Sequence, residues 1–385
     1  MNISTGNKGP LQISVQKLLW ILLICSFTLM YCSEPPSSNE PTNEPTVQAD
    51  ASGPDAKCEP KNGQKCGPQG SEQLAEQIPD QVRGNDTKAP LPEQAPEAPQ
   101  NTDNVIQPDE ATSKPTNKKI FGGSRPATLN VPKDYDAKKS YPLLVVLHGY
   151  GASGIIQSTY LGLNRLVDDK KILMIAPDGT QETVGQKKRF WNATDACCNF
   201  YQSKVDDVAY IKGLVEEISK SYNVDRKKVF LLGHSNGGFM SYRMACEASD
   251  VFAGIVSLAG AMYKNTLLCK PKNSVSILQI HGTQDGTVKY LGGKFGGILP
   301  YPSATESVTA WAGYNKCKGK LEDKSPAYDL DDNLKGSETT RKAFGQCPQG
   351  IGVALWTIQA GGHIPRVTPG FADKAWEWLN NHPKP

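Results

Sequence analysis

Residues 233–237, with the sequence GHSNG, constrain the fold of this 385-residue chain more than any other stretch. They follow the apolar run 229–232 and precede residues 238–244, whose pattern predicts a helix. In a strand, G-x-S-x-G turn and helix, glycines flank the serine because side chains do not fit there, and the strained turn exposes the hydroxyl. We therefore predict that Ser235 is a nucleophile. The alternative is a glycine-rich turn with a surface serine, because short patterns recur by chance.

Residues 33–118 contain no Phe, Trp or Tyr and hold half of the chain's 28 prolines. Such a stretch cannot bury enough apolar surface to offset its conformational entropy. We predict a disordered tether over 32–118 and one α/β catalytic domain over 119–385. The net charge of +3 is small and the lysines are dispersed along the chain, so neither feature indicates a nucleic-acid partner.

The N-terminal apolar run 18–31 follows Lys8 and Lys17 and is short for a membrane span. It is typical of an export signal, predicted over 1–31. Cys32, with Leu29 three positions before it, resembles the lipidated cysteine of a bacterial lipoprotein, although Tyr31 is larger than the residue usual at that point. Ordinary cleavage to a free secreted protein and an uncleaved anchor are the alternatives. All three place the domain outside the cytoplasm.

Cysteine usage agrees with export. Eight cysteines remain besides Cys25 and Cys32, and an even number in an oxidising compartment is typical of disulfides. No paired C-x-x-C or histidine spacing suits zinc, so we predict no metal site. We also expect that the protein needs no cofactor and is a monomer. The expected pairs are Cys317 with Cys347, Cys58 with Cys66, and Cys197 and Cys198 with Cys246 and Cys269 in an order left open.

Short apolar runs alternate with helical patterns across the domain. Residues 206–222 carry an apolar stripe at helical spacing, which predicts a helix packed on the core. Strands that alternate with helices predict a mostly parallel sheet with helices on both faces and a ligand site beyond the carboxyl ends of its strands. The predicted strands are 143–147, 173–176, 229–232, 254–258, 275–280 and 353–358.

Asp285 and His363 follow the fifth and sixth predicted strands. A serine hydroxyl is a weak nucleophile until a base takes its proton, and a histidine base needs a carboxylate to hold its tautomer. We predict Ser235 as nucleophile, Asp285 as acid and His363 as base. Taken singly, Asp285 could be a turn residue and His363 a surface histidine. His234 and His281 are weaker candidates for the base.

The first predicted strand is followed by His148-Gly149-Tyr150, where a glycine lets the backbone approach a substrate. We predict that the backbone N–H groups of Tyr150 and Asn236 form an oxyanion hole, commonly worth ~3 kcal/mol per donor in the transition state. The alternative is a simple end to the strand. His148 and Trp191 are predicted to bind substrate, Trp191 as a wall of the acyl pocket, although a buried aromatic is also consistent with its sequence context.

From about Arg125 to Trp378 the chain resembles secreted esterases grouped with polyhydroxybutyrate depolymerases and feruloyl esterases. This resemblance implies the α/β-hydrolase fold, the same Ser235, Asp285 and His363 roles, and hydrolysis of a carboxylic ester through an acyl-enzyme. The matching stretches are 143–149, 205–208, 233–238, 281–285 and 361–363.

Two classes of function follow. The first is a tethered or secreted serine esterase that acts on a feruloyl, acyl or carbohydrate-linked ester or on a hydroxyalkanoate oligomer. A serine peptidase of the same fold ranks lower because no propeller or large cap domain is encoded. The second class is a surface lipoprotein with a binding role and an inactive hydrolase domain, which a complete triad disfavours. The tether has no aromatic platform for a polymer, so we expect soluble or oligomeric substrates.

Overall fold

The computed structural model describes residues 119–295 and 299–385. The predicted signal, Cys32, the tether and the Cys58–Cys66 pair lie outside the described residues. The helices are α2 Gly154–Tyr160, α3 Leu166–Asp169, α4 Asp207–Ser221, α5 Asn236–Glu247, α6 Ala304–Tyr314 and α7 Phe371–Asn380, with short 3-10 turns η1 Leu163–Arg165 and η2 Thr266–Leu268. The strands are β1 Ile120–Phe121, β2 Ala127–Asn130, β3 Tyr141–Leu147, β4 Leu173–Ile175, β5 Thr180–Gln181, β6 Arg189–Phe190, β7 Val224–His234, β8 Gly254–Leu258, β9 Ser276–Gly282, β10 Gly293–Phe295, β11 Leu299–Tyr301, β12 Leu321–Tyr328, β13 Thr339–Phe344 and β14 Val353–Ile358.

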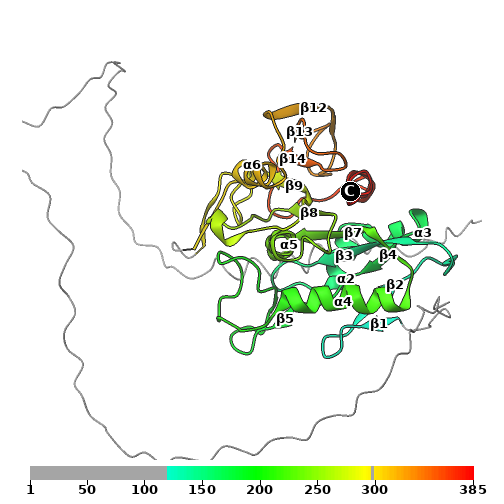
Figure 1. Cartoon of the computed structure of the whole chain (residues 1–385). Helices are drawn as coiled ribbons and strands as arrows, with labels where there is room; N and C mark the ends of the chain where they lie inside the picture. The colour runs from blue at the N-terminus through cyan, green and yellow to red at the C-terminus, as the bar shows by residue number, and fades with distance from the viewer. Residues whose placement is uncertain (1–118, 296–298) are drawn as a thin grey trace, which may run out of the picture. The chain divides into compact units, whose positions relative to one another are not determined.

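Ten strands form one sheet in the order β1-β2-β4-β3-β7-β8-β9-β14-β13-β12 (Figure 1). The six central strands, β4 to β14 in this order, run parallel, and the two strands at each edge are antiparallel. The chain moves outward from β3 to β4 and then returns to β7 on the other side of β3. Ligand sites lie beyond the carboxyl ends of the strands at such a reversal. The predicted mostly parallel sheet is confirmed.

Both faces of the sheet are buried, because alternate side chains of a strand point to opposite faces. In β3, Leu143 and Val145 pack on the face covered by α4, α5 and α6, whereas Leu144 and Val146 pack on the face covered by α3 and α7. All four side chains are buried. A central strand of this kind is apolar throughout, which explains why it is visible in the sequence as a continuous run.

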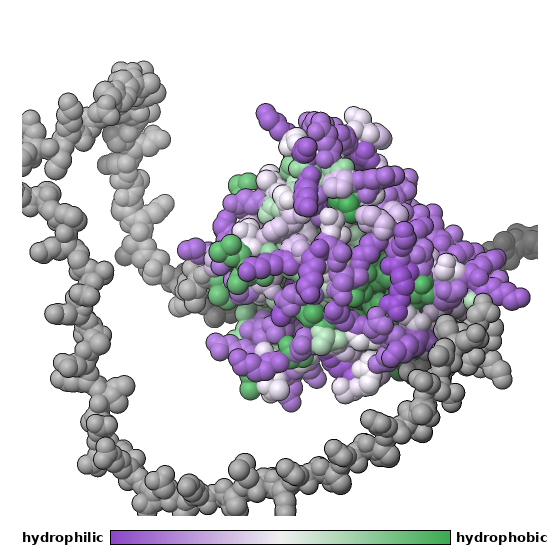
Figure 2. Space-filling model, viewed as in Figure 1, coloured by the Kyte–Doolittle hydropathy of each residue, from purple (hydrophilic) through white to green (hydrophobic). Residues whose placement is uncertain are grey.

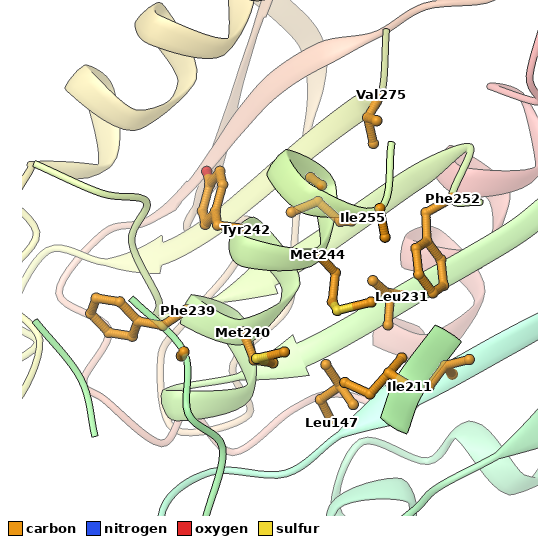
Figure 3. Close-up of a cluster of buried hydrophobic side chains, with 14 of the residues drawn as sticks. Leu147, Ile211, Leu231, Phe239, Met240, Tyr242, Met244, Phe252, Ile255 and Val275 are labelled. Carbon is orange, nitrogen blue, oxygen red and sulfur yellow. The ribbon is translucent and has the colours of Figure 1, made fainter. Parts of the chain in front are cut away.

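Helix α5 is buried almost all round, because it lies between the sheet and neighbouring helices (Figure 3). Its Met240 and Met244 belong to the same buried cluster as Leu147 of β3, Leu231 of β7 and Ile211 of α4. Complete burial of one such side chain is worth ~1.5–3 kcal/mol. The helix that follows Ser235 is therefore held firmly by the core.

The surface of the folded region is mixed in character. Figure 2 shows one face that is mainly hydrophilic, with smaller hydrophobic patches. Within 119–295 and 299–385, no helix combines the length and the apolar character needed to cross a bilayer.

The antiparallel extension formed by β12 and β13 was not predicted. β13 pairs with β14 and with β12, which is the outermost strand. The sequence of β12, LEDKSPAY, is mostly exposed and contains charged residues and Pro326. Natural sheets use charges and proline on edge strands to prevent further pairing, and such a strand lacks the apolar pattern that reveals buried ones.

The structure joins Cys317 to Cys347, the pair favoured by the sequence. It also joins Cys246 to Cys269, and Cys197 to its neighbour Cys198. The expectation that Cys197 and Cys198 bond to Cys246 and Cys269 is therefore wrong.

The arrangement around α5 explains this difference. The turn η2 brings Cys269 to the last turn of α5, where its Cα lies 5.1 Å from that of Cys246. The Cys197 sulfur instead lies 3.8 Å from the Asn236 amide nitrogen, at the first turn of the same helix. Ten residues of helix separate these two ends by ~15 Å, which is too far for a disulfide.

We predict that replacing both Cys246 and Cys269 by serine lowers the free energy of unfolding by ~3 kcal/mol, because the disulfide closes a loop of 23 residues in the unfolded chain. Urea titration without reductant measures the loss. The Cys317→Ser/Cys347→Ser variant is the matched control, because its similar loop of 30 residues should give a similar loss. Free thiols at Cys246 and Cys269 in the unreduced, fully stable protein would contradict the prediction.

Candidate active site

Ser235 stands at a strained turn between β7 and α5. Its φ of 53° and ψ of −119° lie in a region that L-residues rarely adopt. A Cβ atom on Gly233 would overlap the Gly237 carbonyl, and one on Gly237 would overlap the Leu147 carbonyl. The two glycines are therefore required by close backbone approach, as the sequence pattern predicts.

The register of the sheet places three loops at the same level. Leu147 of β3 pairs with Gly233 of β7, and Leu258 of β8 pairs with His234. On the far side of β9, Ile358 of β14 pairs with Gly282. The segments that follow β7, β9 and β14 therefore all begin at the carboxyl edge of the sheet, and β9 and β14 are neighbouring strands.

These loops bring together Ser235, Asp285 and His363. The Ser235 Oγ lies 2.9 Å from the His363 Nε2, and the His363 Nδ1 lies 2.8 Å from the Asp285 Oδ2. Because a carboxylate only accepts, Nδ1–H donates to it, and Nε2 is left to accept the proton of the serine hydroxyl. Ser235 keeps 8% of its surface exposed and Asp285 4%. The arrangement can therefore activate the Ser235 hydroxyl, and Ser235 is still partly accessible from outside.

The carboxylate of Asp285 is fully engaged. Its Oδ1 accepts the backbone N–H groups of Thr287 and Val288, at 2.9 and 2.8 Å. Its Oδ2 lies 2.8 Å from the His363 Nδ1 and 3.2 Å from the His281 Nε2. Burial alone would raise the pKa of Asp285, but the hydrogen bonds from His281 and His363 outweigh it and hold the pKa well below its usual range. The group is therefore an anion throughout the physiological pH range.

The loop of Asp285 is tied directly to the loop of His363. The Gln284 N–H donates to the Gly361 carbonyl at 2.9 Å, and the Ala360 N–H donates to the Thr283 hydroxyl at 2.8 Å. Two loops from neighbouring strands thus act as one unit.

His281 and His234, the weaker candidates for the base, are buried and hold other groups in place. The Nδ1 of His281 accepts from the Gln279 amide at 3.1 Å, and its Nε2–H lies 2.7 Å from the Val288 carbonyl. The Nε2–H of His234 donates to the carbonyl of His363 at 2.9 Å. Burial, with a smaller effect from the nearby His363, lowers the pKa of His234 to about 3. Both histidines support the loops around Asp285 and His363, a role that the sequence alone did not reveal.

The predicted oxyanion donors lie beside Ser235. A Cβ on Gly149 would be 3.4 Å from the Ser235 Cβ, so the loop that carries Tyr150 passes next to the nucleophile. Asn236 is the first residue of α5, where an N–H has no acceptor within the helix and the positive end of the helix dipole adds to its field.

The prediction that His148 and Trp191 contact substrate is not supported. Both side chains are 0% exposed, and both bond to protein groups instead. The Trp191 Nε1–H donates to the His148 carbonyl at 3.1 Å, while the His148 ring bonds to backbone groups of Gly149 and Gly179. A polar cavity of about 670 Å³ is lined by residues 192–197 and by neighbouring segments, and neither Trp191 nor Ser235 is among the residues that line it. Within the described part of the chain, no cluster of three or more His, Cys, Asp or Glu side chains could hold a metal.

Comparisons with known proteins agree with this geometry. Residues 134–295 match the family model described as phospholipase/carboxylesterase. The chain is similar to feruloyl esterase B of Piromyces equi, with 27% identity over 68% of this chain and 46% of that protein, and to the putative esterase NocK of Nocardia uniformis, with 27% identity over 58% and 64%. It therefore spans about half and about two thirds of these two relatives.

Feruloyl esterase D of Neurospora crassa is 24% identical over 68% of this chain and 83% of that protein. Among solved structures, the acetyl xylan esterase from Aspergillus awamori is 18% identical, covers 66% of this chain and 94% of its own, and superposes with a TM-score of 0.47.

We predict that His148 and His234 make the fold acid-sensitive. Burial lowers the pKa of His148 to about 4 and that of His234 to about 3, from a normal value of 6.5. The unfolded chain therefore binds protons that the folded chain does not, so stability present above pH ~6.5 is lost as the pH falls towards ~4, by ~1.4 kcal/mol per pH unit for each histidine.

The measurement is urea unfolding as a function of pH for the wild type and for His234→Gln. Between pH ~6 and ~4.5 the variant should show a slope shallower by ~1.4 kcal/mol per pH unit. Above pH ~7.5, where histidine is neutral in both states, the two curves should run parallel and so serve as the control. Equal slopes at low pH would exclude His234 as a source of the acid sensitivity.

Proposed function

We propose that this protein is a serine esterase that cleaves carboxylic esters through an acyl-enzyme on Ser235, and the match of residues 134–295 to the phospholipase/carboxylesterase family model supports this proposal. The observation that carries the proposal is the continuous set of contacts from the Ser235 hydroxyl through His363 to the buried Asp285 carboxylate, at 2.9 and 2.8 Å. Polar groups in this arrangement raise the nucleophilicity of a hydroxyl that is otherwise inert at neutral pH.

In acylation, the His363 Nε2 takes the proton of Ser235 as its Oγ forms a bond to the ester carbonyl carbon. The tetrahedral intermediate then collapses, the bond from that carbon to the alcohol oxygen breaks, and the imidazolium gives its proton to the leaving alcohol. In deacylation, water follows the same path and releases the acid. Asp285 stabilises the imidazolium in both steps, and its low pKa keeps it charged when the histidine becomes positive.

The negative charge on the carbonyl oxygen of the intermediate needs donors placed before the reaction begins. The backbone N–H groups of Tyr150 and Asn236 are assigned this role, because they flank Ser235 on the loop after β3 and at the start of α5. Loss of one such donor typically lowers kcat by ~10²–10³.

The substrate is proposed to be a feruloyl or other acyl ester, or a hydroxyalkanoate oligomer. The matched relatives named feruloyl esterases support the first of these. The ring of Phe200, 48% exposed, lies 5.4 Å from the ring of Tyr150, beside the proposed oxyanion loop. An exposed aromatic at that place favours an ester with an apolar or aromatic part.

We propose that the protein acts outside the cytoplasm, with Cys32 as the site of a lipid anchor. The three disulfides of the folded region support the first part, because such bonds persist in oxidising compartments. The second part rests on the sequence before Cys32.

We predict that a fluorophosphonate probe labels Ser235, and that Ser235→Ala abolishes labelling and ester hydrolysis. His363→Ala should lower kcat to a similar extent, ~10⁶-fold, and Asp285→Asn less, because the acid only supports the base. Intact mass and peptide mapping locate the label. Equal labelling of Ser235→Ala would refute the assignment of the nucleophile.

The same purified protein distinguishes the substrate classes when it is assayed with p-nitrophenyl acyl esters, methyl ferulate, hydroxybutyrate oligomers and a peptide p-nitroanilide. Hydrolysis of the anilide at a rate comparable to the esters would favour the peptidase alternative. Failure of the wild type to react with probe or ester would favour the binding lipoprotein.

We predict that the full chain, expressed in a bacterium, partitions into detergent and that Cys32→Ser releases it or leaves it unprocessed. A lipid on the mature N-terminal cysteine supplies the membrane affinity. Phase separation followed by mass analysis of the N-terminal peptide checks this. Mature wild-type protein that begins at Ser33 with a free amine would exclude the anchor.

A further inference from the structure

The segment 178–191, which includes the β5–β6 hairpin, is hydrogen-bonded to both places where the oxyanion donors lie. On the side of the loop after β3, the Gly151 N–H donates to the Arg189 carbonyl at 2.8 Å. The Gly179 N–H donates to the His148 Nε2 at 2.8 Å, and the Trp191 indole N–H donates to the His148 carbonyl at 3.1 Å. Backbone and side chains of the segment thus hold the loop on several sides.

The Tyr150 side chain adds a further link to the same segment. Its hydroxyl donates to the carboxylate of Glu182, whose other oxygen accepts the Lys188 N–H at 3.1 Å. Glu182 is buried, and burial together with the bond to Glu182 raises the pKa of Tyr150 above its usual value. The phenol therefore stays protonated and can donate at neutral pH.

On the side of the Ser235 turn, a pair of hydrogen bonds, here called the clamp, joins the segment to α5. The Asn236 Oδ1 accepts the Trp191 backbone N–H at 2.7 Å, and the Asn236 Nδ2 donates to the Trp191 carbonyl at 3.0 Å. Both residues are fully buried, so no water competes for these bonds. Trp191 is thus bonded both to the residue that carries one oxyanion donor and to the loop that carries the other.

The His148 ring orients the peptide that holds the Tyr150 N–H. Its Nδ1–H donates to the Gly149 carbonyl at 2.7 Å, and that carbonyl also accepts the Ala152 N–H at 3.0 Å. The Gly149 carbonyl and the Tyr150 N–H belong to the same planar trans peptide, so fixing one direction fixes the other, opposite direction. Burial lowers the pKa of His148 to about 4, which keeps the ring in the neutral form that accepts from Gly179.

We propose that Trp191 is the positioning residue that sets the distance between the two oxyanion donors, through the Asn236 side chain on one side and the His148 carbonyl on the other. It touches no substrate, because it is fully buried. The inference rests on the proposed serine esterase function and adds to it a residue that acts through its neighbours. Donors that lie ~2.7–3.1 Å from the developing oxyanion are effective, so a small displacement affects the transition state more than substrate binding.

The test uses Asn236→Ala, which removes both bonds of the clamp, and Trp191→Phe, which keeps an aromatic ring but removes the indole N–H. We expect kcat to fall ~10–100-fold in the first and ~3–10-fold in the second, with KM within ~2-fold of the wild type. The inhibition constant of a trifluoromethyl ketone, whose serine adduct carries an oxyanion, should rise by the same factor as kcat/KM falls.

Trp311→Phe is the matched control. Trp311 is also fully buried, lies on α6, and its indole N–H has no partner among the described residues. The control should show a melting temperature close to that of Trp191→Phe but wild-type kcat and ketone inhibition. Asn236→Asp keeps the acceptor for the Trp191 N–H and should recover part of the loss in Asn236→Ala. If Asn236→Ala does not unfold cooperatively, Trp191→Phe and Asn236→Asp carry the test.

The outcomes separate this inference from the proposed function. A wild type that hydrolyses esters, with variants that keep its kcat and ketone inhibition, overturns the positioning role alone. Variants with a raised KM and an unchanged kcat also overturn it, because that result indicates ground-state substrate contact. A wild type that neither hydrolyses esters nor binds the ketone overturns the proposed function and this inference with it.

Discussion

The backbone of Ser235 is the constraint on which the rest of the site depends. A residue with φ of 53° and ψ of −119° costs ~1–3 kcal/mol, and it persists only where its surroundings hold it in that conformation. Here β7 before it is paired on both edges, and α5 after it is buried by Met240, Met244 and their neighbours. The core therefore supplies the stability that the turn lacks. A strained turn on a rigid support gives a hydroxyl that is fixed in position and still reachable.

The polar groups around this hydroxyl are arranged by the ends of parallel strands. The loops of Asp285 and His363 start level with each other and are hydrogen-bonded together, so their side chains meet without any long connection. Inside the protein, buried polar groups are costly unless they are paired, and a paired network is rigid. Asp285 accepts from both backbone and histidine groups, while His234 fixes the backbone of His363. The network can therefore hold one tautomer and one geometry.

The side of the site that carries the proposed oxyanion donors is built differently. The segment 178–191 contains only two very short strands, and hydrogen bonds rather than strand pairing join it to the loops around Tyr150 and Asn236. Such loops carry function because a rigid scaffold surrounds them. Trp191 joins the two sides, which explains why a large aromatic residue is buried at a place where a substrate wall was expected.

The sequence by itself determined the six parallel strands, helix α4 and the order of Ser235, Asp285 and His363, because apolar periodicity and the strand, turn and helix pattern are local properties. It did not reveal the β12–β13 extension, whose exposed edge lacks such periodicity. The pairing of Cys246 with Cys269 and the burial of Trp191 were decided only by the tertiary structure. Both depend on contacts between segments far apart in the chain, and the packing of α5 against the sheet is what brings those segments together.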